Sequence, residues 1–169
     1  MKTMKMRFAE RMPKGEVARP AELWQFYIDT CEDYTARGLT YASDTLPAVS
    51  SIMSTMSLGL GEYYAGTWEY GLLISLQWEA MNTKDCVRHE NYVAPSWSWA
   101  SRSGAVMWYM QEIKPSIAGE AHDFATIVDV SCTLATADPY GKISASHLTL
   151  EGFTTTMSIE SMEMLEPDG

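Results

Sequence analysis

The chain has 169 residues, of which 46% are hydrophobic and 20% charged, and its formal net charge is −10 at pH 7. This is the composition of one globular domain, and a chain of this length buries roughly 70% of its unfolded surface without a metal or disulfide staple. The excess of 22 acidic over 12 basic residues argues against nucleic-acid partners and anionic membrane surfaces, because both require a basic face.

The basic residues gather at the N-terminus. Residues 1–19 hold six of the twelve basic side chains and two acidic ones, so this segment carries +4 and the remainder −14. It lacks the apolar core of a secretory signal, and we expect a basic disordered tail. The longest uncharged stretch, 45–61, is rich in Ser and Thr and falls short of the ~18 apolar residues of a membrane span, so we expect no membrane partner.

The first half of the chain has helical periodicity. Pro20 opens a predicted helix, which ends at Arg37-Gly38, where glycine can adopt a positive φ. Asp44 caps a second predicted helix. After the Gly59–Gly61 break, a third is expected over 62–80, and it should be the most buried. The apolar stripes of the three helices are Leu23, Tyr27, Cys31 and Tyr34; Leu46, Val49, Met53 and Met56; and Tyr64, Trp68, Leu72 and Leu76.

The second half favours strands. The polar segment 82–91 is a predicted loop, after which alternation over 96–100 predicts a strand with Trp97 and Trp99 on one face and Pro95 at its start or edge. Further strands are expected over 106–110 and 124–136, and either a pair of strands or one kinked strand over 143–157, with a bulge at Gly152. A loop is expected over 114–123 and a turn over 138–141.

These patterns predict an α+β fold in which a helical N-terminal half of about three helices packs on a C-terminal antiparallel β-sheet. We divide the chain into the basic tail 1–19 and a single module over 20–157, helical over 20–80, a loop over 82–91 and β-rich over 92–157. An acidic tail at 158–169 is expected to be frayed.

The sequence offers little for catalysis or metal binding. Gly59, Gly61 and Gly66 do not have the spacing of a dinucleotide loop, and no Gly-x-Ser-x-Gly elbow occurs. The histidines His89, His122 and His147 lack ligand spacing to the cysteines. We therefore predict no catalytic residue, no metal and no cofactor. The cysteines Cys31, Cys86 and Cys132 are an odd number at wide spacing, which favours a reducing, cytoplasmic location.

Two apolar groups have alternative interpretations. Trp97, Trp99, Trp108 and Tyr109 would form a stacking platform for a sugar or flat ligand if exposed, whereas large indoles usually belong to a core, and we favour the core. The methionines are mostly core filler, with Met53 and Met56 as candidates for a soft contact surface.

Several motifs occur in a fixed order. They are 34–40 (YTARGLT), then Asp44, Leu46, Ala48 and Ile52, then 64–68 (YAGTW) with 72–73 (LL) and 76–78 (LQW), then 94–101 (APSWSWAS) and 139–141 (PYG). In order and spacing this resembles fungal heterokaryon-incompatibility (HET) domain proteins, over about residues 24–153, in the region that follows the HET domain. The motif residues, expected to be structural, are Arg37, Leu39, Thr40, Asp44, Gly66, Trp68, Trp78, Pro95, Trp97 and Trp99.

The resemblance implies a part in non-self recognition and programmed cell death. In this family the effector domain, thought to be related to Toll/interleukin-receptor domains, ends near an Arg-x-Trp-x-x-Gln-Glu block, which this sequence lacks. Any NAD-consuming activity of that domain therefore has no residues here. We expect a non-catalytic accessory module whose partner is a HET effector domain, in cis or in trans.

Departures from the family pattern leave alternatives open. Thr45 replaces a basic residue, Ser51 a glycine and Thr67 an apolar residue. The basic start has no family counterpart, which is consistent with an alternative start or a misplaced gene boundary. The alternatives are a ligand-binding β-module that uses the Trp cluster, an inactive truncated copy, and an enzyme in its own right. The oligomeric state is open.

The motifs also have a structural interpretation. Arg37 lies at a helix end, where its charge opposes the helix dipole, and its guanidinium could clamp Asp44 across the connection. We expect this pair to set the angle between the first two helices. Trp68 and Trp78 are expected to pack against Trp97 or Trp99 and so join the two halves.

Overall fold

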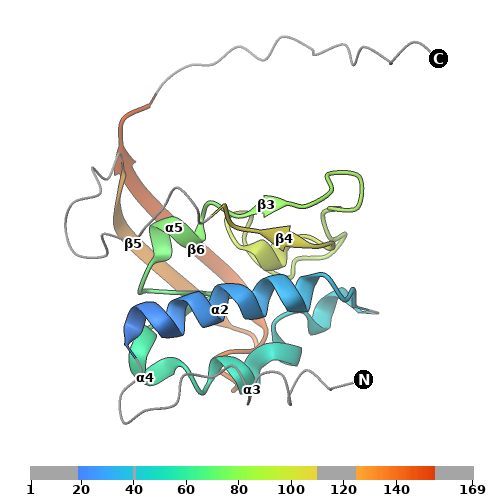
Figure 1. The fold of residues 1–169 in the computed structure, drawn as a ribbon, viewed down its shortest axis with the longest axis horizontal. Coiled ribbons are helices and arrows are strands. Elements are labelled where there is room, and N and C mark those ends of the chain that lie inside the picture. The colour runs from blue at the N-terminus through green and yellow to red at the C-terminus, as the bar shows by residue number, and fades with distance from the viewer. Residues whose placement is uncertain (1–18, 40, 110–124, 155–169) are drawn as a thin grey trace.

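A computed structural model of the chain describes residues 19–39, 41–109 and 125–154. It is an α+β fold, with helices in the N-terminal half and long antiparallel strands in the C-terminal half, as predicted. In the view of Figure 1 helix α2 crosses in front of the hairpin of β5 and β6. Apart from Arg19, the predicted basic tail lies outside the described residues, as do the loop at 114–123, Thr40 and the acidic tail.

Helix α2 (Pro20–Thr35) is the longest helix of the described chain and matches the prediction closely. Pro20 stands in its first turn, where no amide hydrogen bond is lost. Gly38 follows the helix with φ +66°, the left-handed conformation expected of a glycine at a C-terminus. All four residues of the predicted apolar face are buried.

The predicted second helix is broken into 3-10 turns η1 (Ala42–Asp44) and η2 (Pro47–Val49) and the short helix α3 (Ser50–Met53). Asp44 lies within η1 and makes no capping hydrogen bond, so its predicted role as a cap is wrong. The lack of an amide hydrogen at Pro47 favours separate turns over one helix. The predicted stripe is buried, which makes Met53 and Met56 core residues and not a contact surface.

The predicted third helix does not form. Helix α4 (Ser57–Leu60) is followed by strands β1 (Tyr63–Tyr64) and β2 (Thr67–Trp68), helix α5 (Leu72–Ser75) and strand β3 (Glu79–Ala80). Ala65 and Gly66 both have positive φ, at +49° and +100°, and form the two-residue turn of the β1–β2 hairpin. The aromatic and β-branched residues beside that turn favour strands.

The predicted strand over 96–100 is also absent. This segment consists of turns and the 3-10 helix η3 (Trp99–Ser101), capped by the Ser98 hydroxyl, which accepts a bond from the Ala100 amide. Trp97 and Trp99 therefore do not share the face of a strand. Residues 82–91 contain no helix or strand, as predicted, and hold one isolated bridge between Arg88 and Arg102. Strand β4 (Val106–Met107) pairs with β3.

Strands β5 (Ala125–Leu134) and β6 (Ile143–Gly152) form the predicted hairpin. Its turn is closed by a bond from the Gly141 amide to the Asp138 carbonyl. The register shifts lie at 127–129 and 133–134, whereas Gly152 pairs regularly with Ala125, so the predicted bulge at Gly152 is wrong. The described strands form three separate two-stranded sheets, not one continuous sheet.

One core cluster includes residues of α2, the short helices, β2, η3, β4 and the start of β6. Its largest fully buried side chains include Trp24, Trp68, Trp99 and Tyr27. Helix α2 contacts α4 and β4, while α5 and β1 contact β5. In the described part of the chain, no helix has the length and apolar character of a membrane span.

Candidate functional site

The most specific motifs of the sequence meet at the β1–β2 turn. The Gly66 carbonyl accepts hydrogen bonds from the Tyr27 hydroxyl and from Trp99 Nε1, each at 2.8 Å. The neighbouring Ala65 carbonyl accepts one from the Ser98 hydroxyl at 2.5 Å. We call these five residues the turn hub. The hub joins α2, the YAGTW motif and the APSWSWAS motif within the core, so these residues serve packing.

Gly66 is required at the hub by geometry. Its φ of +100° is strained for any other residue. A Cβ added there would lie 3.1 Å from Trp99 Nε1 and 3.2 Å from Leu46 Cδ2. The close approach lets two buried donors reach one carbonyl, and this is a structural use of the glycine.

The other motif tryptophans pack in part as predicted. Trp68 lies edge-on to Tyr63 at 5.0 Å between ring centroids and tilted to Tyr140 at 6.0 Å. Its ring partners are thus tyrosines and not Trp97 or Trp99. Trp78 does meet Trp97, because its Nε1 donates to the Trp97 carbonyl at 3.0 Å.

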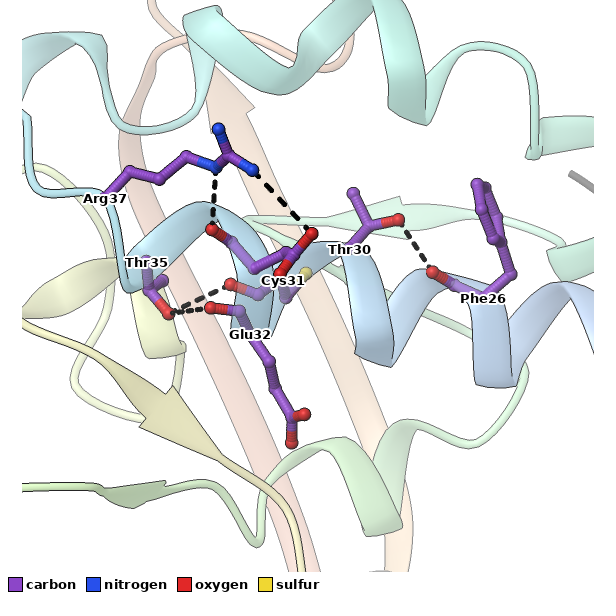
Figure 2. A network of polar contacts seen from close by, with 7 residues as sticks. Phe26, Thr30, Cys31, Glu32, Thr35 and Arg37 are labelled. Atoms are coloured by element: carbon purple, nitrogen blue, oxygen red, sulfur yellow. Dashed lines mark hydrogen bonds and ion pairs between the residues drawn. The ribbon is translucent and has the colours of Figure 1, made fainter. Parts of the chain in front are cut away.

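The predicted clamp between Arg37 and Asp44 is wrong. Arg37 Nε donates to the Asp33 carbonyl at 3.0 Å, and its guanidinium lies 3.8 Å from the Asp33 carboxylate (Figure 2). Arg37 lies just beyond the end of α2 and folds back onto the last turns of that helix, four residues earlier in the chain. The connection is held instead by Tyr34, whose hydroxyl donates to the Thr45 carbonyl at 2.8 Å. Leu39 is exposed and Pro95 is buried.

The opposite side of α2 holds strand β4. The Trp108 amide donates to Glu32 Oε1 at 2.9 Å, and the Val106 amide donates to the Thr35 hydroxyl at 3.1 Å. In Figure 2 the Glu32 carboxylate and the Arg37 guanidinium point in opposite directions from the helix. Glu32 is therefore a structural acceptor.

The four aromatic side chains considered as a stacking platform do not form one exposed surface. Trp99 and Trp108 are buried, and Trp108 Nε1 donates to the Ser75 carbonyl at 3.1 Å. Trp97 is half-buried and Tyr109 is exposed. The core interpretation is confirmed for Trp99 and Trp108, and two of the four rings cannot meet a ligand.

Two hollows, of about 330 and 360 Å³, lie beside the segment 85–104 and share His89 and Arg102 as lining residues. Arg88 and Ser101 line the larger hollow. Burial lowers the pKa of His89, while hydrogen bonding to the backbone of Arg102 and Ala100 acts in the opposite direction. Neither the arginines nor this histidine were predicted as site residues.

The β5–β6 hairpin carries a polar trio. His147 Nδ1 lies 3.0 Å from the Ser131 hydroxyl, and His147 Nε2 pairs with the Asp129 carboxylate. These residue types recur in hydrolases, but here all three are exposed on a sheet face and none of them lines either hollow. Cross-strand hydrogen bonding accounts for the trio.

The described residues contain no group of three or more metal-ligating side chains, and the three cysteines are free thiols. Comparisons of the chain with protein-family models, with curated proteins and with solved structures found no match.

Proposed function

We propose that this chain is a non-catalytic accessory module of a HET-type non-self-recognition and programmed-cell-death protein, and that it acts in the cytoplasm by contacting the HET effector domain, in cis or in trans. The observation that carries the proposal is the turn hub. The residues that create the resemblance, Gly66 and Trp99 above all, are used to pack a scaffold. A scaffold in which these motif residues are committed to packing suits a module that supports or restrains another domain.

The contact surface we propose is the end of the hairpin remote from its turn. Val128 is 58% exposed, Leu150 46% and Phe153 92%. Leu150 pairs with Ile127 in the register, next to the bulge that contains Val128, and Phe153 directly follows β6. Exposed apolar side chains gathered on a two-stranded sheet favour a protein interface. We call Val128, Leu150 and Phe153 the distal hairpin surface.

Calorimetric titration of the full chain with a purified HET effector domain tests the proposal. The double variant Leu150→Ser with Phe153→Ser should weaken binding about tenfold or more, because apolar anchors at the centre of an interface dominate its affinity. Leu58→Ser is the matched control, since Leu58 is 102% exposed on α4. Circular dichroism checks that each variant folds.

Two results would contradict the proposal. One is failure of the wild-type chain to bind the effector domain in trans, together with unchanged hydrogen exchange in β5 and β6 when the two are fused; this result favours an inactive copy. The other is NAD hydrolysis by the purified chain, which would identify an enzyme.

A further inference from the structure

Two arginines face each other beside the larger hollow. Arg88 and Arg102 are directly opposite in an isolated antiparallel bridge, so their side chains leave the backbone on the same side. Both are exposed, and both line the hollow of about 360 Å³. Among the described residues, ion pairs are made by Arg37 and His147 and not by these two arginines.

This placement is unfavourable in the free protein. Like charges directly opposite each other on paired strands repel. The chain as a whole carries a net charge of −10, so two adjacent unpaired guanidinium groups do not follow from a general excess of basic residues. Glu90 lines the same hollow, and Asp85, which lines the smaller one, is hydrogen-bonded by Asn82 at 2.6 Å.

An anionic ligand in the hollow would neutralise the arginine pair and so relieve this repulsion. We infer that the larger hollow binds a small phosphate-bearing molecule, with the phosphate held between Arg88 and Arg102.

Each guanidinium can form two parallel bonds to phosphate oxygens. The two negative charges of a phosphate dianion balance the two positive charges of the arginine pair, whereas a single carboxylate balances only one of them. The hollow has the volume of a small-molecule site, so it accepts a sugar-sized group beside the phosphate.

Calorimetric titration of the full chain with inorganic phosphate, ribose 5-phosphate and ribose tests this inference. Phosphate and ribose 5-phosphate should bind saturably, and ribose should not. Arg88→Gln and Arg102→Gln should each weaken binding about tenfold or more, because charge-assisted bonds are lost. Lys142→Gln is the matched control: it removes the same charge from an exposed residue outside this hollow, and its affinity should equal that of the wild type.

Three outcomes would overturn the inference: no saturable binding of either phosphate compound, equal losses in the arginine variants and in Lys142→Gln, or binding of succinate as tight as that of phosphate. These outcomes do not test the proposed binding of the effector domain, because the distal hairpin surface has no residue in common with this hollow.

Discussion

At the scale of single residues, the motifs of this chain act through backbone carbonyl groups. Gly66 and Ala65 present their carbonyls to three buried side-chain donors, from Tyr27, Ser98 and Trp99. None of these bonds is visible in a helical or strand periodicity, because the partners lie 33 or 39 residues apart. The conformational freedom of one glycine makes them possible.

Gly66→Ala should lower the free energy of unfolding by about 2–4 kcal/mol, since it adds backbone strain and overpacks the core against Trp99. Gly38→Ala is its matched control: Gly38 has φ +66°, and a Cβ there would meet nothing within 4 Å. It should cost about 1 kcal/mol. Urea unfolding measures both, and equal losses would show that the contact with Trp99 is unimportant.

At the scale of elements, α2 organises the molecule through its two sides. One side buries apolar residues against the short helices, and the other accepts the amide hydrogens of Val106 in β4 and of Trp108 directly after it. The helix was predictable because its signals are local: a proline in the first turn, a glycine after the end and four apolar residues on one face. The hydrogen bonds that the helix accepts from Val106 and Trp108 were not predictable, because the bonded residues are 71 and 76 positions apart in the sequence.

Glu32→Ala should destabilise the protein by about 1–3 kcal/mol, because the partly buried Trp108 amide then lacks its acceptor. Glu32→Gln keeps a side-chain carbonyl oxygen and should cost less than half as much. Chemical denaturation of the two variants gives the comparison. If both lose the same stability, the carboxylate charge and not the hydrogen bond is responsible.

At the scale of the whole molecule, ionisable groups within the core or packed against it limit stability at high pH. Burial raises the pKa of Tyr27 and Tyr63 well above the ordinary 10.0, and that of Cys31 well above 9.0. In the unfolded chain these groups ionise at their ordinary values. Above about pH 9 the unfolded state therefore binds fewer protons than the folded state, and the free energy of unfolding falls as pH rises.

Urea unfolding between pH 7 and pH 11 should show this fall, with each group contributing up to about 1.4 kcal/mol per pH unit. Tyr63→Phe should make the fall less steep. It should not destabilise the protein at pH 7, because the buried Tyr63 hydroxyl has no hydrogen-bond partner in the described structure. A free energy of unfolding that stays constant above pH 9 would contradict this prediction.

The phosphate site that we propose in the larger hollow also depends on the fold of the whole molecule. Segment 82–91 was predicted only as a polar loop, since nothing in its sequence indicates a site. Arg88 and Arg102 come together because the chain turns back on itself and forms one bridge between them. Two arginines 14 residues apart carry no recognisable spacing, so this site depends on the path of the backbone.

Local sequence signals were sufficient to predict α2, the buried stripe of Leu46, Val49, Met53 and Met56, and the strands β5 and β6 with the turn between them. Each of these features is encoded by residues close together in the chain. Long-range contacts set the conformation of segments 62–80 and 96–101, where apolar spacing alone predicted the wrong elements. In 62–80, Trp68 and Leu72 lie four residues apart and are buried, and Trp68 packs against the distant Tyr140. The positive φ of Ala65 and Gly66 turns the chain where a helix would have continued.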